Sequence, residues 1–388
     1  MFALMHGRVI AMGNLLGPGD LAPADLATIL ALADDFAADP YGAGRVLAGR
    51  TVVLAFTVPA LVTWAAVATA VTRLGGVPFM IGPGDWHPAL GGSVAGTVPV
   101  LGAYAAALVV RNRRHDDTIR YAAAVASYTV APSTVAAPLA PVVPLTPIAS
   151  LARLVPRAAT APVSSDPVAP VAAASAAPAA AVAPVASIAP AAGVASIRRD
   201  GSPAPVVNAG DDRYLPLTAI SALYTARRLR GDLSHSTLAY VGDGNPFANS
   251  LLLTAALAGV DVAVATPPGY EPDADAVAAA EKYAATSGAR ITVVHNPVEA
   301  VRHAAVVFAD GWPPVMDTGE DAGLRATRMA AFTGYRVDGR LLACAPPGVV
   351  ALSHRAGAVP GPAGYAVAAN LLPVAQAVLF HLVAGAES

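Results

Sequence analysis

The chain has 388 residues, enough for two domains of ordinary size, and its formal net charge at pH 7 is -2 with a pI near 6.4. This charge balance argues against a nucleic-acid partner and against a polybasic membrane contact, which leaves small-molecule chemistry or protein binding. The single cysteine, Cys344, excludes an internal disulfide framework and any thiolate-rich metal site. From its residue type alone, we expect the Cys344 side chain to be buried and apolar in its contacts.

The N-terminus, MFALMHGRVIAMGNLLGPGD, lacks a charged segment followed by a sustained apolar core. No other stretch has the pattern of a clean apolar helix of about 18 residues, the length that would span a membrane. We therefore expect a cytoplasmic protein with no membrane partner.

Strand and helix patterns alternate in the first part of the chain. A helical pattern in LAPADLATILALADDF precedes the strand TVVLAF, a helix over residues 60–74, the strand VPFMIG, a helix near residues 93–105 and the strand AALVVRN. Such alternation predicts a parallel sheet with helices on both faces.

The alternation stops between residues 131 and 200. No residue from Pro167 to Ile197 is charged, and proline recurs so often that this stretch cannot span a membrane as a helix. It also has too little large apolar surface to offset the entropy lost on ordering, so we expect a disordered, partly polyproline II insert.

Order is expected to resume at APVVNAG, followed by a long helix from about Pro216. The stretch STLAYVGDGNPFANSLLLTAALAGVDVAVATPPGY has the pattern strand, glycine turn, helix, strand, which is one βαβ unit. Three further segments, ARITVVHNP, AAVVFADGW and RLLACAPPG, are predicted strands. Each ends in a turn of the kind where an open α/β sheet places its ligands. The last helix, GYAVAANLLPVAQAVLFHLVAG, is long enough to return to the first unit.

The glycine turn VGDGNPFANS does not fit a dinucleotide site, because Phe247 stands where a third glycine is needed and the next strand ends in AVATP without a carboxylate. The sequence also lacks a glycine-rich Lys-Ser/Thr phosphate loop, a His-x-x-x-His pair and a cluster of carboxylates. We therefore expect no cofactor and no metal.

The order of these segments resembles the aspartate and ornithine carbamoyltransferases over nearly all of the chain outside the insert. The likeness is best in the second half, where YVGDGNPFANSLLLTAALAGVDVAVATPPGYEPD, EAVRHAAVVFADGW and LLACAPP follow the ornithine-type enzymes almost without gaps. The first half agrees in the spacing of LAPADLATILALADDF, LAGRTVVLAF, RLGGVPFMIG and ALVVRN. The resemblance implies an α/β fold of two doubly wound parallel-sheet domains.

The resemblance also implies the domain boundaries. Residues 1–130 correspond to a carbamoyl-phosphate-binding domain interrupted by the insert at 131–200, and residues 201–230 form its end and an interdomain helix. Residues 231–360 correspond to an amino-acid-binding domain, and residues 361–388 to a C-terminal helix that returns to the first domain. The resemblance also implies a homotrimer, because the active sites of this family lie next to the contacts between subunits.

The motifs that hold carbamoyl phosphate in this family are largely replaced. The family's Ser-Thr-Arg-Thr-Arg turn, whose hydroxyls, N–H groups and first arginine hold the phosphate, falls on residues 60–64, ALVTW, so that only Thr63 is kept. The His-Pro-Thr-Gln motif falls on residues 215–218, LPLT, and the arginine of Glu-Asn-Arg falls on Leu371. Arg111 matches an arginine that contacts the carbamoyl oxygen, and Cys344 matches the cysteine of His-Cys-Leu-Pro.

These replacements predict an apolar cleft. Val62, Trp64, Leu215 and Leu371 would line it, and Arg111 would be its main cation.

The amino-acid side of the site is half kept. Asp310 and Trp312 match the family's Asp-x-Trp, whose aspartate engages the substrate amine, whereas the following Ser-Met-Gly has become residues 314–316, PVM. In the glycine turn, Asn245 is kept and the second asparagine is replaced by Pro246. A structural role is the alternative, in which Asn245 and Asn249 cap a helix and Asp310 ends a strand.

The sequence therefore favours a non-catalytic or regulatory homologue that binds an amino acid or a neutral ligand, or one that partners an active carbamoyltransferase. One alternative is an active carbamoyltransferase with an altered donor or acceptor, for example an amino-acid amine such as that of ornithine. Another is a different reaction in the same cleft.

Overall fold

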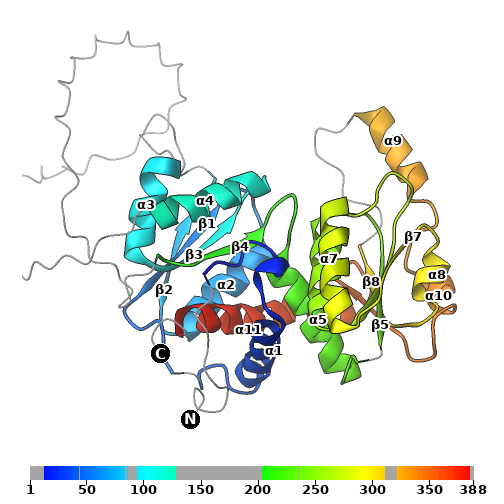
Figure 1. Cartoon of the computed structure of the whole chain (residues 1–388), viewed down its shortest axis with the longest axis horizontal. Helices are drawn as coiled ribbons and strands as arrows, with labels where there is room; N and C mark the ends of the chain where they lie inside the picture. Colours follow the sequence, from blue (N-terminus) through cyan, green and yellow to red (C-terminus); the bar gives the residue numbers. More distant parts are fainter. Residues whose placement is uncertain are drawn as a thin grey trace, which may run out of the picture. The chain divides into compact units, whose positions relative to one another are not determined.

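The computed structural model describes residues 13–42, 44–83, 85, 94–127, 203–234, 236–310 and 321–384 (Figure 1). Two parallel sheets lie within these residues, which confirms the expected fold class. The predicted insert lies outside the described ranges, and the domain boundaries stay predictions.

The first sheet has four strands in the order β2-β1-β3-β4. Its strands are β1 (Thr51–Phe56), β2 (Val77–Ile81), β3 (Ala105–Arg111) and β4 (Val206–Gly210). Side chains alternate between the two faces of a strand, so Val52 and Leu54 join one apolar cluster while Val53 and Ala55 join another. Because both faces are covered, β1 is a continuous apolar run.

Helices cover the two faces of this sheet (Figure 1). On one face lie α3 (Val94–Tyr104) and α4 (His115–Ser127), and on the other α1 (Pro23–Ala38), α2 (Leu61–Arg73) and α11 (Ala363–Ala384). The sequence did not predict α4. Its polar start, HDD, followed by YAAAVAS, is a signal for a helix that begins with acidic residues.

The second sheet has five strands in the order β7-β6-β5-β8-β9. They are β5 (Thr237–Val241), β6 (Asp261–Ala265), β7 (Ile291–Val294), β8 (Ala304–Ala309) and β9 (Val350–Ser353). The helices of this part are α5 (Pro216–Arg230), α6 (Pro246–Leu257), α7 (Ala274–Ser287), α8 (Pro297–Val301), α9 (Ala322–Ala331) and α10 (Gly339–Leu342).

The strand predicted at RLLACAPPG is wrong. Residues Gly339–Leu342 form the helix α10, because the Asp338 carboxylate accepts hydrogen bonds from the N–H groups of Arg340 and Leu341 and so caps a helix start. The last strand of the sheet is β9, which begins at Val350.

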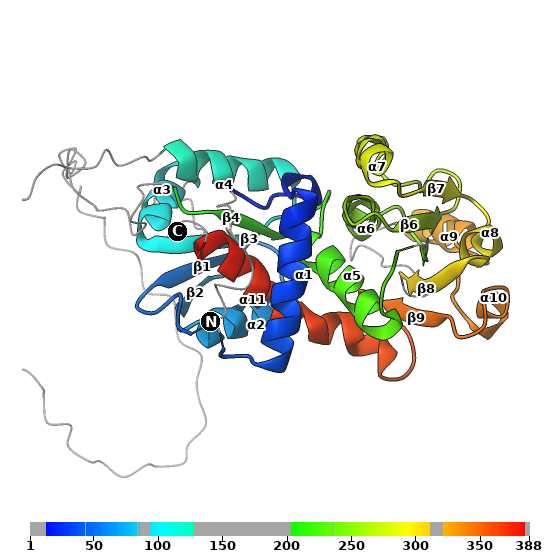
Figure 2. The same ribbon diagram turned by 60° about the horizontal axis from the view of Figure 1, so that its bottom comes forward.

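The C-terminal helix α11 packs against α1, α2 and α5 (Figure 2). By length and composition it is apolar enough to cross a membrane, with a mean hydropathy of 1.8, which corrects the expectation that no stretch has this pattern. Most of that apolar window, 72%, is buried within the protein. We therefore interpret α11 as a core helix.

Candidate functional site

A cavity of about 270 Å³ lies where the N-terminal end of α2 meets α5, α11 and the turn after β9. Six of its lining residues are alanine or larger aliphatic side chains on α2 or α11, or just before α2: Ala60, Leu61, Val62, Val367, Ala368 and Leu371. The turns after β1 and β9 both follow the carboxyl ends of parallel strands, the edge where open α/β sheets bind ligands.

The start of α2 presents apolar side chains at the mouth of this cavity. Leu61 and Val62 are 74% and 50% exposed, and the residue before the helix, Ala60, has no side chain that can cap it. The first N–H groups of a helix have no partner within the helix. The only hydroxyl among the first residues of α2 that line the cavity belongs to Thr63.

Arg355 supplies the cavity's only charged side chain among the described residues that line it. Its Nε lies 3.6 Å from Oδ1 of Asp310, and its side chain is 30% exposed. Its backbone N–H donates to the Ser353 hydroxyl, which fixes the turn that begins where β9 ends.

His354 is neutral at physiological pH. Its ring stacks on Phe247 with the centroids 4.2 Å apart, and its side chain is only 9% exposed. Burial lowers the pKa of His354 to about 4, although attraction to the Asp310 carboxylate opposes part of that effect. The cavity therefore has Arg355 as a cation and His354 as an uncharged wall.

Asp310 follows β8 and is buried beside the glycine turn. Its Oδ1 accepts a 2.9 Å hydrogen bond from the Asn245 side-chain amide, and Asp243 donates its backbone N–H to Oδ2 at 3.4 Å. The Asn245 side-chain oxygen accepts the N–H groups of Phe247 and Ala248, so Asn245 caps α6 and also holds Asp310.

A second cavity, of about 550 Å³, lies next to Asp310. Besides Asp310, it is lined by Tyr335, Arg336 and Asp338, and by Val359 after β9. Asp310 therefore lines this cavity and also lies 3.6 Å from both His354 and Arg355, which line the smaller one.

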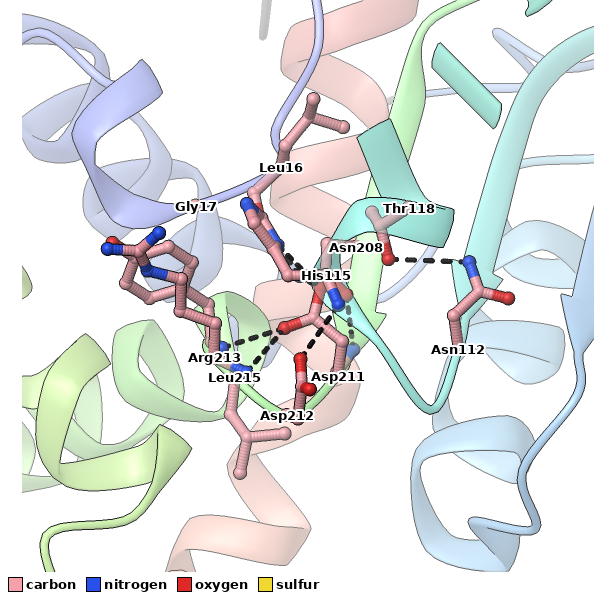
Figure 3. Close-up of polar contacts among 12 residues, drawn as sticks. Leu16, Gly17, Asn112, His115, Thr118, Asn208, Asp211, Asp212, Arg213 and Leu215 are labelled. Atoms are coloured by element: carbon pink, nitrogen blue, oxygen red, sulfur yellow. Dashed lines mark hydrogen bonds and ion pairs between the residues drawn. The ribbon is translucent and has the colours of Figure 1, made fainter. Parts of the chain in front are cut away.

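A buried polar cluster holds the loop between β4 and α5, which carries the start of α5 to the site (Figure 3). The Asp211 carboxylate accepts the N–H groups of Arg213 and Tyr214 on Oδ1, and contacts Asn208 Nδ2 and His115 Nδ1 on Oδ2, each at 2.8 or 2.9 Å. Burial alone raises the pKa of Asp211, but the bonds from His115 and from the two backbone N–H groups outweigh it. The pKa of Asp211 is therefore lowered.

Comparison with the sequences of known proteins shows the family of this chain. Residues 14–137 match the family described as aspartate/ornithine carbamoyltransferase, carbamoyl-P binding domain, and residues 234–354 match the Asp/Orn binding domain of the same family. An ornithine carbamoyltransferase of Parafrankia sp. (strain EAN1pec) is 30% identical over 337 residues, which cover 86% of this chain and 80% of the relative. The chain belongs to the aspartate/ornithine carbamoyltransferase family.

Other relatives agree with this assignment. The ornithine carbamoyltransferase of Acidothermus cellulolyticus is 29% identical over 95% of this chain and 90% of its own length. Among solved structures, the ornithine carbamoyltransferase of Pyrococcus furiosus covers 97% of this chain and 98% of its own, with a TM-score of 0.69 and 24% identity. The enzyme of Gloeobacter violaceus covers 96% and 99%, with a TM-score of 0.65 and 24% identity. These two structures show that the fold is shared.

Arg111, the expected main cation of the cleft, is not among the described lining residues of the smaller cavity. Its Nη1 donates to the carbonyl of Ala209 at 2.9 Å, and its guanidinium lies in the same crowded space beside Gly210 as the Leu215 side chain. Burial lowers the pKa of Arg111, and the nearby Asp211 charge opposes this. The arginine that does line the cavity is Arg355, which the sequence patterns did not point to.

The resemblance to the carbamoyltransferase motifs also predicted Cys344 and Trp312 as site residues. Cys344 is exposed, which corrects the expected burial, and it lies in the turn after α10 rather than at the end of a strand. Its thiol makes a weak contact of 3.7 Å with the carbonyl of Arg340, and Cys344 is not among the described residues that line either cavity. Trp312 lies outside the described residues.

Two other expected features differ in detail. Asn249 does not cap α6. Its amide donates to the Arg213 carbonyl and accepts the N–H of Asp273, so it ties two loops together. Trp64 donates its indole N–H to the Met80 sulfur and is not among the described lining residues. Within the described residues, no group of three metal-binding side chains occurs.

Proposed function

We propose that this carbamoyltransferase-family protein is a non-catalytic member that has lost the use of carbamoyl phosphate and acts as a ligand-binding or regulatory homologue. The observation that carries the proposal is the lining of the smaller cavity, where Leu61, Val62 and Leu371 stand at positions that the family resemblance assigns to phosphate or carbamoyl recognition. Arg111 is tied to a backbone carbonyl instead.

The size of the expected loss supports this proposal. A charge-assisted hydrogen bond contributes about 1.5 to 3 kcal/mol, so removal of three or four without replacement costs at least about 5 kcal/mol. That corresponds to a loss of affinity of roughly 10³-fold or more. Arg355 does not replace them, because it is a single cation that already shares its charge with Asp310 at 3.6 Å, and the donors lost number three or four.

An active carbamoyltransferase with an altered donor or acceptor is the second candidate. One observation favours it: Asn245 and Asp310 are hydrogen-bonded at 2.9 Å and Asp310 lines the larger cavity, which is the arrangement that part of an amino-acid site would need. In this case Thr63, Arg111 and Cys344 would act on the carbamoyl side, and Asn245, Asp310 and Trp312 on the amino-acid side. A different reaction in the cleft has no observation of its own in its favour.

Carbamoyl phosphate at millimolar concentration is expected to leave the thermal unfolding midpoint unchanged. A ligand that binds only the folded state at 100 times its dissociation constant adds about 2.7 kcal/mol, which differential scanning fluorimetry detects readily. The dipole of α2 contributes only about 0.3 to 1 kcal/mol for an anion and cannot replace the lost ion pairs. An ornithine carbamoyltransferase treated in parallel is the positive control. A clear upward shift for this protein would contradict the proposal.

We also propose a cytoplasmic homotrimer, on its own or with an active carbamoyltransferase. The edge strand β2 exposes Val77 and Phe79, at 60% and 52%, and α2 exposes Leu61. Exposed apolar edges of this kind are usually covered by another chain. Light scattering should give three times the chain mass, and Phe79→Glu should reduce it to the monomer. Leu229→Glu, at another exposed apolar position, should leave the trimer intact. A monomeric parent protein would refute this assembly.

A further inference from the structure

The smaller cavity combines an apolar wall with one accessible guanidinium. Val367 and Leu371 on α11 form its buried side, and Leu61 and Val62 on α2 form its exposed side. Its volume of about 270 Å³ equals that of roughly nine water molecules at about 30 Å³ each. A small anion such as phosphate would leave most of this wall uncovered, so the wall favours a ligand with an apolar body.

Arg355 already pairs with Asp310, and its guanidinium has donors left for a second anionic group. Its Nε is the atom nearest to Asp310, and among the described residues its two Nη groups have no hydrogen-bond partner. A guanidinium offers two parallel N–H donors that fit the two oxygens of a carboxylate. The uncapped start of α2 also faces this cavity, and a helix N-terminus favours negative charge.

The charges around the cavity define the class of ligand further. The described lining contains no carboxylate, so nothing there would hold an ammonium group. The Asp310 carboxylate, which is only 3% exposed, offsets the charge of Arg355 on the Nε side of the guanidinium. Arg355 and Asp310 together carry no net charge, so the Nη groups can hold one carboxylate through hydrogen bonds, whereas a dianion would leave two charges uncompensated beside apolar walls.

Given the proposed loss of carbamoyl phosphate, we infer that the cavity binds a small monocarboxylate with a branched aliphatic body. Its carboxylate lies on the Nη groups of Arg355. Its aliphatic part lies against Val62, Val367 and Leu371, and Thr63 and Thr218 are the hydroxyl-bearing residues of the same lining.

The test uses 4-methylpentanoate as the probe, with ligand-observed NMR titration of the full-length protein. The acid should bind saturably at millimolar concentration, and its uncharged isostere 4-methylpentanamide should bind at least about tenfold more weakly, because it lacks the charge-assisted pair. L-leucine, which adds only an ammonium group to the same skeleton, should also bind more weakly. Equal binding of the amide, or tighter binding of leucine, would overturn the inference.

Two variants locate the site. Arg355→Gln should weaken 4-methylpentanoate binding at least about tenfold. Val62→Glu places a like charge at an exposed position of the mouth and should weaken the acid while leaving folding unchanged. Arg340→Gln, at an exposed position outside the cavity, is the matched control and should bind as the parent does. Unchanged binding in both Arg355→Gln and Val62→Glu would overturn the assignment.

Carbamoyl phosphate in the same titration separates the two proposals. If neither it nor 4-methylpentanoate binds, the carboxylate inference fails while the proposed loss of carbamoyl phosphate stands. If carbamoyl phosphate binds in an Arg355-dependent way, both fail, because Arg355 would then have taken over the role of the replaced arginines.

Discussion

Asp211→Asn is expected to lower the free energy of unfolding by about 3 kcal/mol or more, since each buried donor left without a partner costs about 1 to 3 kcal/mol. The Asp211 carboxylate serves four donors, two on each oxygen (Figure 3). An asparagine keeps one oxygen and turns an NH₂ group toward the other two donors, whichever way the amide is oriented. The loop that carries Leu215 and the start of α5 would lose its support.

Urea unfolding at neutral pH measures this effect. Asp116→Asn is the control, because the Asp116 side chain is 65% exposed and its pair with Arg114 is a surface ion pair worth about 0 to 1 kcal/mol. The folded-state pKa of Asp211 is lowered, so its contribution is present above the unfolded pKa and is lost only when the pH falls through the folded value. Equal stability of the two variants would mean that the cluster does not hold the loop.

His354 is expected to make the protein lose about 2 kcal/mol of stability between about pH 7.5 and about pH 5. Its folded pKa of about 4 lies below the ordinary value of 6.5, so the unfolded chain binds the proton more readily. Stability is therefore complete above the unfolded pKa and falls as the pH drops below it, until the pH reaches the folded value. The buried ring stacked on Phe247 is the physical cause.

A comparison of the parent with His354→Gln isolates this contribution. Urea unfolding of both proteins at the two pH values should show the smaller loss in the variant, with a difference of about 2 kcal/mol. His381, another buried histidine whose pKa burial lowers, contributes equally to both proteins and cancels. His303→Gln, at an exposed position, should keep the parent's pH dependence. The same loss in His354→Gln as in the parent would show that the imidazole is not held neutral by burial.

The strands that sequence patterns predicted well are those with both faces buried. After their first threonine, runs such as TVVLAF and TLAYV are almost entirely apolar, because both faces of these strands in parallel sheets are buried. The strand misplaced at residues 340–348 failed for a local reason: LLACA is apolar enough for a strand, but the Asp338 cap commits the preceding residues to a helix. The true strand, VALS, is four residues long and easily overlooked.

That one shift also explains the missed site residues. His354 and Arg355 directly follow β9, which the sequence patterns did not predict, so neither was placed at the end of a strand. Cys344 was expected at the site because LLACAPP resembles the segment of the family that contains His-Cys-Leu-Pro. Arg111 was expected in the cleft because family resemblance fixes a position along the chain but not the direction of a side chain. Gly210 leaves room for its guanidinium beside Leu215, and the Ala209 carbonyl accepts its N–H. By contrast, the apolar residues Val62 and Leu371 do line the cavity as expected.

The most direct test of the proposed loss of catalysis is an assay of the purified protein with carbamoyl phosphate and ornithine, in which citrulline and phosphate are measured together. An ornithine carbamoyltransferase serves as the positive control, and a reaction without protein gives the rate at which carbamoyl phosphate decomposes. We predict no citrulline and no phosphate beyond that background rate. Citrulline formed in step with released phosphate would contradict the proposal, because it would show that the cleft still binds carbamoyl phosphate and transfers its carbamoyl group.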